Sequence, residues 1–527
     1  MKQKITKDTV KKIIDDLLAE KKHPKVLQVC NRTLKIWSDF MEVHQIRFDV
    51  LQEMKEWENL QNAAKEFLET FPEDILGWQV LGFSLLKQEQ FKEADIVAQN
   101  AIFMDPSDAK SWSLRGRIYR AQKKFRMACS CYHKAYALSP NDVEILTTFG
   151  VVQMDVGNYV KAIQLQNQAH RLAPNDENVL LNLGSALMAQ GMLKKSIEVY
   201  HKAMNLKPDI PGIEWNLAFP LLLDNNYEQG FPALDGRFSL PETPKIDWLP
   251  ESWNGENLQG GRLLIEAEQG FGDLLQFARF FEMAAQKDAK ILLRCHPKMM
   301  KIMKGIYGLS DCYSAYETPP EHEARIALLS LPKVLALRSP KALRTAYLQA
   351  PKENIEIWKP RFAANTQKNI RNIGIVWQGN PTYAADHLRS IPLERYSTFL
   401  GEAGCEFFSL QKFHGLNQLH DLNSARAPTD LGKELDIREH AFEDTAAVIS
   451  LLDLVITSDT SIAHLAGALG TPVWTMLPFA PDWRWGLQTE TTPWYPNMRL
   501  FRQPKPNDWQ SVVNKVHQEL ILLKNKN

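Results

Sequence analysis

Polar residues that could bind a phosphate follow a short apolar run at Leu454–Ile456, in the sequence LVITSDTSIAHLAGALGTPVW. The run is rich in β-branched residues, which is typical of a buried parallel strand. The residues after it predict a helix, with Ser458 or Asp459 as its N-cap and Gly470 at its end. A helix N-terminus offers free N–H groups to a phosphate, and His464 would add a donor one turn further on. The same pattern also fits an ordinary strand–turn–helix unit, because the loop has no glycine fingerprint.

Length and charge narrow the class of protein. The chain has 527 residues, more than one hydrophobic core organises, so two to four domains are expected. Its 62 basic and 62 acidic residues balance, which gives no basic field for nucleic acid or a membrane surface. Charges interrupt the apolar segments, so neither a signal peptide nor a membrane-spanning helix is predicted. A cytoplasmic protein is expected, with scattered cysteines that lack the spacing of a zinc site.

Prolines recur every 34 residues in the first half of the chain, at positions 72, 106, 140, 174 and 208. Small residues recur with them, at Gly82, Gly116, Gly150 and Gly184 and at Ala94, Ala128, Ala162 and Ser196. Small residues let two antiparallel helices cross closely, and each proline ends the second helix. This pattern resembles the tetratricopeptide repeat, strongly over residues 75–208 and more weakly at 7–40 and 41–74. With a further helix pair at 211–238, it predicts a right-handed solenoid of six to seven hairpins over residues 1–238.

The first helix of each repeat is expected to line a concave face of the solenoid. Its predicted lining residues are Gln79, Phe83, Leu86, Lys87, Ser113, Arg117, Arg120, Thr147, Val151, Met154, Leu181, Ser185 and Met188. A mixed polar and apolar face of this kind usually holds an extended peptide or another protein. Alternatively, the solenoid only spaces or dimerises the chain.

The second half of the chain alternates predicted strands and helices after a Pro-, Gly- and Trp-rich connector at 239–261. The first series comprises the strand Arg262–Ile265, the loop Glu266–Asp273, the helix Leu274–Ala285, the strand Lys290–Leu293, the helix Pro297–Ile306 and a strand at Arg325–Leu331. The second comprises strands at 373–377, 406–410, 454–456 and 473–477, helices at 392–403 and 443–452, and a final helix from Asp508 to about Leu523. This alternation predicts two Rossmann-like domains, 262–365 and 366–527, with a ligand cleft at the carboxyl ends of their strands.

Several motifs of the second half are specific enough to suggest a family: EQGFGDLLQFARF, GIVWQGNP, RSIPL, EDTAAVISLLDLVITSDTSIAHLAGALGTPVW, LPFAPDWRW and PWYPNMRLFRQ. They resemble the catalytic region of bacterial tetratricopeptide-repeat glycosyltransferases, whose GT-B module is related to the heptosyltransferases of lipopolysaccharide synthesis. Together with the repeats, the resemblance covers nearly the whole chain, and flagellin glycosyltransferases share this organisation. The expected fold class is therefore an α superhelical repeat solenoid followed by an α/β GT-B module.

The resemblance implies a site built from both Rossmann-like domains. Asp273 would be the base that deprotonates the acceptor hydroxyl, although its position equally suits a helix cap. The residues that would shape its loop are Gln269, Gly270 and Gly272. The residues of the donor site would be Gln378, Asn380, Arg389, Ser458, Asp459, Thr460, Ser461 and His464. Members of the similar family usually carry a sequence close to N-D-R just before Arg389, where this chain has Ala385-Asp386-His387-Leu388. Either His387 or Arg389 could therefore contact phosphate, with Arg389 favoured. Asp459 is an anion and is expected to cap the helix or orient His464.

The chain contains no D-x-D triplet, which predicts transfer without a bound metal ion. Backbone amides, a helix dipole and cationic side chains would then neutralise the leaving group. No cofactor is expected besides the nucleotide-sugar co-substrate.

The predicted function is transfer of a sugar from a nucleotide sugar to a Ser or Thr hydroxyl of a protein acceptor, such as a flagellin, recruited by the repeats. A lipid-linked acceptor would make no use of so long a peptide-binding solenoid, and the chain has no basic amphipathic helix to hold it at a membrane. Two alternatives remain. One is an interaction scaffold with a non-catalytic nucleotide-binding module, and the other is a saccharide-directed glycosyltransferase of cell-surface polysaccharide synthesis.

Overall fold

The computed structural model describes residues 6–241, 243, 246–340, 344–367, 370–422, 427–437 and 440–525. The chain divides into two compact units, Met1–Asn182 and Leu183–Asn527. The boundary between the units falls inside the helix α11 (Glu177–Ala189). Each unit is described by itself below.

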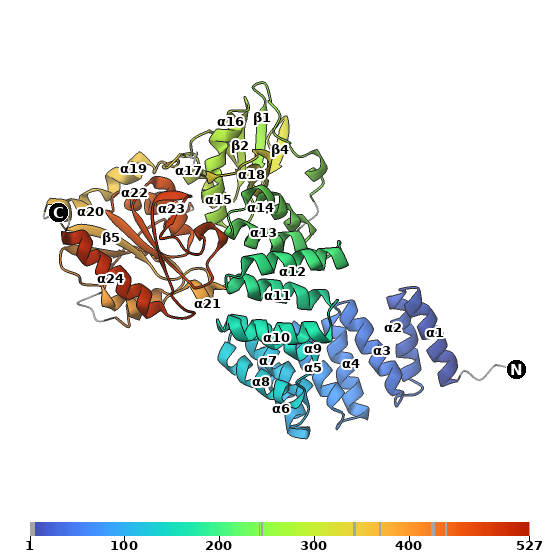
Figure 1. Cartoon of the computed structure of the whole chain (residues 1–527). Coiled ribbons are helices and arrows are strands. Elements are labelled where there is room, and N and C mark those ends of the chain that lie inside the picture. Colours follow the sequence, from blue (N-terminus) through green and yellow to red (C-terminus); the bar gives the residue numbers. More distant parts are fainter. Residues whose placement is uncertain are drawn as a thin grey trace. The chain divides into compact units, whose positions relative to one another are not determined.

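The first unit is an array of helices joined in pairs by short turns (Figure 1). Its helices are α1 (Lys7–Ala19), α2 (His23–Leu34), α3 (Met41–Glu53), α4 (Trp57–Thr70), α5 (Ile75–Lys87), α6 (Phe91–Met104), α7 (Ala109–Ala121), α8 (Phe125–Leu138), α9 (Val143–Asp155) and α10 (Tyr159–Leu172). The second unit continues the helical pattern with α12 (Leu193–Leu206), α13 (Ile213–Leu223) and α14 (Tyr227–Ala233). The predicted helical repeats are therefore confirmed.

The turn inside each hairpin contains one residue in the left-handed backbone conformation, with φ between 54° and 79°. These residues, each 34 positions after the one before, are Lys21, Lys55, Glu89, Lys123, Gly157, Gly191 and Asn225. Within the described residues they mark seven hairpins, including the two N-terminal pairs whose sequence pattern is weak. The turn geometry thus keeps the 34-residue period where the side-chain pattern has faded.

The repeated glycines are explained by close helix crossing. A Cβ atom at Gly116 would lie 2.6 Å from the Tyr132 ring of the paired helix, and one at Gly150 would lie 2.4 Å from the Gln166 amide. At Gly116 the added atom would meet a buried aromatic ring, which cannot shift at little cost, whereas at Gly150 it would meet the end of a flexible glutamine side chain. Each Trp indole of α5 and α7 in turn donates a hydrogen bond to a proline carbonyl of the preceding turn, from Trp78 to Pro72 at 2.9 Å and from Trp112 to Pro106 at 3.0 Å.

Two sheets follow in the second unit. In the described chain, the first has four parallel strands in the order β3-β2-β1-β4, and the second has seven in the order β10-β11-β9-β8-β5-β6-β7. The strands of the first sheet are β1 (Arg262–Glu266), β2 (Lys290–Cys295), β3 (Leu309–Ser314) and β4 (Ala324–Ala327). The strands of the second are β5 (Arg371–Val376), β6 (Cys405–Ser409), β7 (Thr429–Asp430), β8 (Leu454–Ser458), β9 (Val473–Leu477), β10 (Thr491–Thr492) and β11 (Tyr495–Arg502). All pairings are parallel except that of β10 with β11, so two Rossmann-like sheets are present.

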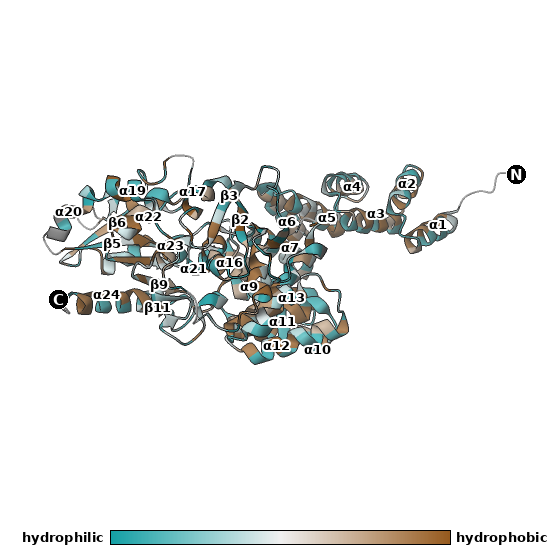
Figure 2. Cartoon of the chain, turned by 90° about the horizontal axis from the view of Figure 1, so that it is seen from above, coloured by the Kyte–Doolittle hydropathy of each residue, from teal (hydrophilic) through white to brown (hydrophobic). Residues whose placement is uncertain are grey.

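Helices cover both sheets. They are α15 (Phe271–Phe277), α16 (Phe281–Ala285), α17 (Met300–Met303), α18 (Leu331–Val334), α19 (Lys352–Trp358), α20 (Pro360–Gln367), α21 (Asp386–Arg389), α22 (Glu443–Ser450), α23 (Ser461–Leu469) and α24 (Trp509–Asn525). The long α24 shows hydrophobic and hydrophilic residues along its length in Figure 2, and its apolar residues pack on one face of the seven-stranded sheet. The expected fold class, a helical repeat array followed by a GT-B type pair of α/β sheets, is confirmed.

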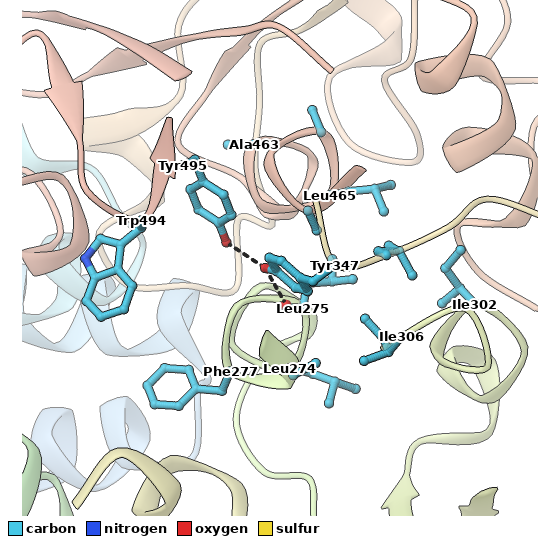
Figure 3. Close-up of a cluster of buried hydrophobic side chains, with 14 of the residues drawn as sticks. Leu274, Leu275, Phe277, Ile302, Ile306, Tyr347, Ala463, Leu465, Trp494 and Tyr495 are labelled. Carbon is cyan, nitrogen blue, oxygen red and sulfur yellow. Dashed lines mark hydrogen bonds between the residues drawn. The ribbon is translucent and has the colours of Figure 1, made fainter. Parts of the chain in front are cut away.

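The two sheets share a hydrophobic core. One cluster of buried side chains includes residues of α13 and α14, of the four-stranded sheet, and of one face of the seven-stranded sheet. Figure 3 shows part of it, where the Tyr347 hydroxyl donates to the Leu275 carbonyl at 2.9 Å and lies 3.3 Å from the Tyr495 hydroxyl. The backbone N–H groups of Tyr347 and Leu348 both donate to the carbonyl of Ala468 in α23, at 3.0 and 3.1 Å. Tyr347 and Leu348, which lie in the sequence between the two sheets, are therefore part of the contact between them.

Four predicted elements differ in the structure. The helix predicted at 297–306 is a 3₁₀ turn at Pro297–Met299 followed by the short α17, which ends at Met303. The helix predicted at 274–285 is broken into α15, a 3₁₀ turn at Ala278–Phe280 and α16, and the strand predicted at 325–331 ends at Ala327. The helix predicted at 392–403 is a 3₁₀ segment over Leu393–Thr398. The segment follows Pro392. Its buried side chains Leu393 and Tyr396 are three residues apart, a spacing that places them on the same side of a 3₁₀ helix. The strand β11 was not predicted, because Pro496 and Asn497 near its start are typical of a loop.

The last helical hairpin packs against the α/β part of its unit. Leu193, Leu222 and Phe231 belong to the same buried cluster as the four-stranded sheet, and α13 contacts the turn at Trp483–Trp485. The predicted domain limit at residue 238 therefore lies inside a continuous core, whereas the compact units separate at Asn182.

Candidate active site

The predicted donor loop joins β8 to α23. Thr460 is the N-cap of α23, and its hydroxyl accepts the Ile462 N–H at 3.3 Å. Neither residue expected to cap this helix does so, because Asp459 precedes the cap and Ser458 is the last residue of β8. The Ser458 hydroxyl is fully buried and has no hydrogen-bond partner within the described chain. Gly470 ends α23 in the left-handed conformation, as predicted, with φ +83°.

The predicted acceptor-side loop joins β1 to α15. Asp273 is the third residue of α15, and its Oδ2 accepts the Gly270 N–H at 3.0 Å, so it supports the helix start without being the N-cap. Gln269 has φ +63°, which is uncommon for a residue with a side chain. This strained backbone turns the chain so that Gly270 can begin the helix and Asp273 can bond back to it.

The two loops meet directly. The helices α15 and α23 pack on each other, and a Cβ atom at Gly272 would lie 3.1 Å from Cδ2 of His464 and 3.7 Å from Cα of Ser461. Gly272 therefore allows the acceptor-side loop to approach the start of α23. Where a ligand cleft was expected between the two domains, α15 and α23 are in direct contact at Gly272.

His464 is held by aromatic residues. Its Nδ1 lies 2.9 Å from the Tyr495 hydroxyl, and its ring stacks on Trp485 with centroids 5.2 Å apart. The expectation that Asp459 orients His464 is therefore wrong for this structure: the partner is Tyr495. Burial and the positive charges of Arg484, Arg279 and Arg389 hold the pKa of His464 well below 6.5. The ring is thus neutral at pH 7 and can offer one N–H as a donor but no positive charge.

Arg484 connects the two sheets' loops, and sequence reasoning missed it. Its guanidinium donates from Nη2 to Asp273 Oδ1, from Nη1 to Asp482 Oδ1 at 2.9 Å, and from Nε to Gln276 Oε1. The side chain is 9% exposed. Burial works against its charge, but Asp482 and Asp273 outweigh that effect and raise the pKa of Arg484. The signal in the sequence was a single arginine between two tryptophans in the motif PDWRW.

Asp459 belongs to the same group of charges. Burial, reinforced by the negative charge of Asp482, raises the pKa of Asp459 from 3.8 to about 6, while Arg389 and Arg484 act in the opposite direction. The buried Asp459 and the partly exposed Asp482 therefore lie near two arginines at the end of β8. A group of this kind, with a perturbed carboxyl group, is typical of a functional site.

Arg389 is the second cation of the site. Its Nε donates to Asp386 Oδ1 at 3.1 Å, and its guanidinium lies 4.6 Å from the Tyr383 ring centre. A Cβ atom at Gly379 would lie 2.7 Å from Nη2 of Arg389, so the QGNP loop needs a glycine where the arginine passes. His387, the alternative to Arg389, lies 3.1 Å through Nδ1 from the Ala384 carbonyl. The influence of Arg389 on the pKa of both Asp459 and His464 makes it the better candidate.

Gln378 and Asn380 are not brought into this group by the contacts they make. The backbone of Gln378 pairs with the side chain of Gln411, and its own Oε1 accepts from Gln418 at 3.1 Å. Asn380 closes a turn by accepting the Thr382 N–H at 3.0 Å. The structure therefore brings together Gly272, Asp273, Ser461 and His464 with Arg484, whereas Gln378 and Asn380 shape the neighbouring loop.

Models of known families match parts of the chain. Residues 438–515, which include the donor loop and Arg484, match the model of glycosyltransferase family 9 (heptosyltransferase). Residues 109–142 and 177–210 match tetratricopeptide-repeat models. The chain carries tetratricopeptide repeats and a glycosyltransferase family 9 domain of the GT-B type. The resemblance inferred from the sequence motifs is therefore confirmed.

A curated relative and two solved structures are similar to parts of the chain at low identity. The protein FlbA of Caulobacter vibrioides is 26% identical over 315 residues, which cover 55% of this chain and 51% of FlbA. The chain thus spans about half the length of this curated relative. Among solved structures, the Cut9–Hcn1 tetramer of the APC/C matches with 20% identity and a TM-score of 0.37, covering 45% of this chain and 47% of that chain. The tetratricopeptide-repeat protein YrrB matches with 19% identity and a TM-score of 0.29, covering 34% of this chain and 93% of YrrB.

A search for membrane-spanning segments gave a negative result within the residues that the structure describes. None of their helices is both long and apolar enough to cross a bilayer.

Proposed function

We propose that the chain transfers a sugar from a nucleotide sugar to a hydroxyl group of a protein held by the helical repeats. One observation carries the proposal. The loop with Asp273 and the start of α23 come from different sheets and meet at Gly272, where an added Cβ atom would lie 3.1 Å from Cδ2 of His464. A base from one domain and an anion-binding helix start from the other are the two parts that glycosyl transfer requires.

The chemistry assigns a role to each part. Asp273 takes the proton of the acceptor hydroxyl as its oxygen bonds to the anomeric carbon of the sugar. The bond from that carbon to the nucleotide phosphate breaks, and its electron pair leaves with the phosphate. The N–H groups at the start of α23 stabilise the departing negative charge together with Arg389. His464 contributes an N–H from a neutral ring.

A specific observation supports a second candidate, a nucleotide-binding scaffold without transfer activity. Both carboxylate oxygens of Asp273 accept hydrogen bonds, one from Arg484 and one from the Gly270 N–H. Both oxygens are therefore occupied before an acceptor hydroxyl arrives. Transfer requires the acceptor to reach an Asp273 that Arg484 already contacts.

Titration calorimetry of the full chain with nucleoside diphosphates and nucleotide sugars tests donor binding. We expect binding of nucleotides that carry one particular nucleobase. We also expect EDTA to leave nucleotide binding and turnover unchanged. In a Thr460→Ala/His464→Ala double variant, binding should weaken by about 1–3 kcal/mol for each hydrogen bond lost to a charged phosphate. Unchanged affinity in the folded variant would remove the α23 loop from the site. Binding without hydrolysis or transfer by the wild type would favour the scaffold.

The role of the repeats is tested by deletion. Residues 1–174 end before α11, so their removal leaves the hydrophobic core of the second unit intact. We expect the shortened chain to bind and hydrolyse the donor at the rate of the full chain and to lose transfer to the protein acceptor. Equal transfer by both chains, or a saccharide as the natural acceptor, would contradict recruitment by the repeats.

A further inference from the structure

The loop that carries Asp273 is attached to the helical hairpin before it by a buried arginine. Arg237 lies in a 3₁₀ segment, Leu234–Ser239, that follows α14, and its side chain is 1% exposed. Its Nε donates to Glu268 Oε2 at 2.9 Å and its Nη2 donates to Glu268 Oε1 at 2.6 Å. Glu268 lies in the loop between β1 and Asp273. This paired geometry fixes both the position and the direction of the carboxylate.

Further hydrogen bonds hold Arg237 and Glu268, some of them from the turn after β4. The Leu329 N–H donates to Glu268 Oε1 at 3.1 Å, and Nη2 of Arg237 also donates to the Ser330 hydroxyl at 3.0 Å. Nη1 of Arg237 donates to Asp235 Oδ1 at 2.9 Å and to the Leu234 carbonyl at 2.8 Å. The hairpin, the β1–α15 loop and the turn after β4 therefore meet at one buried ion pair.

Asp235 completes the network. Burial opposes its charge, but bonds from Lys333 and Ser330 and the charge of Arg237 outweigh burial and keep the pKa of Asp235 below 3.8. The segment also packs closely on α13, because a Cβ atom at Gly236 would lie 2.4 Å from the Trp215 backbone nitrogen. Arg237 is thus anchored on the helical side before it reaches the loop.

We propose that Arg237 is a positioning residue for the reaction: through Glu268 it fixes the β1–α15 loop and so places Asp273 opposite α23. This inference rests on the proposed function. It makes the last helical hairpin a part of the catalytic machinery, in addition to any part that the repeats play in recruiting an acceptor. Four residues separate Glu268 from Asp273, and the strained Gln269 follows Glu268 directly, so a shift at Glu268 passes into the start of α15.

The first test follows amide hydrogen–deuterium exchange in the full chain and needs no ligand. Arg237→Lys keeps the charge but loses the paired geometry, and Glu268→Gln keeps the shape but loses the charge. In each variant we expect roughly tenfold faster exchange in residues 267–274 and unchanged exchange in β2. The matched control is Arg338→Ala, which removes an exposed ion pair at 3.1 Å with Glu228 of the same hairpin. The control should leave loop exchange as in the wild type.

The second test measures nucleotide-sugar hydrolysis per nucleotide-binding site, counted by calorimetry with the nucleotide that binds the wild type. We expect at least a tenfold lower rate in Arg237→Lys at unchanged nucleotide affinity, because α23 lies on the other sheet. A purely structural role would lower the number of binding sites and leave the rate per site unchanged.

The outcomes separate this inference from the proposed function. Loop exchange that stays at the wild-type rate in both folded variants overturns the positioning role, and so does equal loss of protection in β2, which indicates general unfolding. If the wild type binds no nucleotide, the proposed function fails while the exchange test still decides the coupling. If hydrolysis proceeds equally in wild type and Arg237→Lys, the function stands and the positioning role fails.

Discussion

The arginine–carboxylate pairs of the repeats and the buried arginine networks of the second unit lie in opposite surroundings. In the repeats, Arg117 of α7 pairs with Glu144 of α9, and Arg120 pairs with Asp155, all with side chains between 18% and 66% exposed. In the second unit, Arg484 and Arg237 are 9% and 1% exposed and each contacts two carboxylates. Water screens the exposed pairs. In a buried pair, by contrast, loss of one partner leaves a buried charge without compensation and destabilises the fold. The repeats should therefore accept charge changes that the site cannot.

The largest effect is expected from Arg484→Met. Removal of the guanidinium leaves Asp273 and Asp482 without their shared partner beside the buried Asp459, so the free energy of unfolding should fall by about 3–5 kcal/mol. Donor hydrolysis should be lost as well. Chemical denaturation of the variant measures the first effect. The control, Arg499→Met, removes a partly exposed arginine of the same unit that pairs with Glu490 and Glu519. Equal losses in the two variants would contradict the contrast between buried and exposed pairs.

Asp459→Asn should stabilise the protein at neutral pH. Because the folded pKa of Asp459 is raised from 3.8 to about 6, the carboxylate costs stability that appears as pH rises from about 4 to 6 and is complete above 6. Its removal should gain about 2–3 kcal/mol at pH 7 and nothing below pH 4. His464 has the opposite sign, since its lowered pKa makes stability fall as pH drops below 6.5.

The free energy of unfolding, measured from pH 4 to 8 in the wild type and in Asp459→Asn, checks this prediction. Asp508→Asn is a control of opposite sign, because hydrogen bonds from the backbone and side chain of Ser511 lower the pKa of Asp508. A pH-independent difference between Asp459→Asn and wild type would show that the charge of Asp459 carries no cost.

Gly116→Ala tests whether close packing, rather than charge, stabilises the repeats. The added methyl group would meet the buried Tyr132 ring at 2.6 Å, so a loss of about 1–3 kcal/mol is expected despite the better helix propensity of alanine. Thermal unfolding followed by circular dichroism measures it. The double variant Gly116→Ala/Tyr132→Leu should recover part of the loss, and no loss in the single variant would mean that the helices can separate at little cost.

The smallest effect is expected from Arg117→Ala, which removes an exposed ion pair and should change stability by less than about 1 kcal/mol. If the concave face binds an acceptor, the same variant should still lower transfer to that protein. A stability loss as large as that of Arg484→Met would erase the difference between the two units.

The sequence predicted regular features better than exceptional ones. The 34-residue period gave the hairpins, and alternating apolar runs gave the strands β1, β2, β5, β6, β8 and β9, because each depends on local pattern. The strand β11 and the broken helix at 274–285 depend on distant packing and were missed. In the site, Asp273 and His464 stood in recognisable motifs. Arg484 and Tyr495 act across a fold that joins residues about 200 and 30 positions apart, and no local spacing indicates such contacts.

The edges of the seven-stranded sheet bear on how the chain avoids association with its own copies. At one edge lies β7 and at the other the antiparallel β10, and each is two residues long. A neighbouring chain that added a strand at either edge would find too little extended backbone to pair with. The four-stranded sheet has the four-residue β4 at one edge and the six-residue β3 at the other, where Ser310 and Asp311 are exposed. Aggregation during folding would therefore begin at β3, where one carboxylate, Asp311, discourages a second chain from pairing.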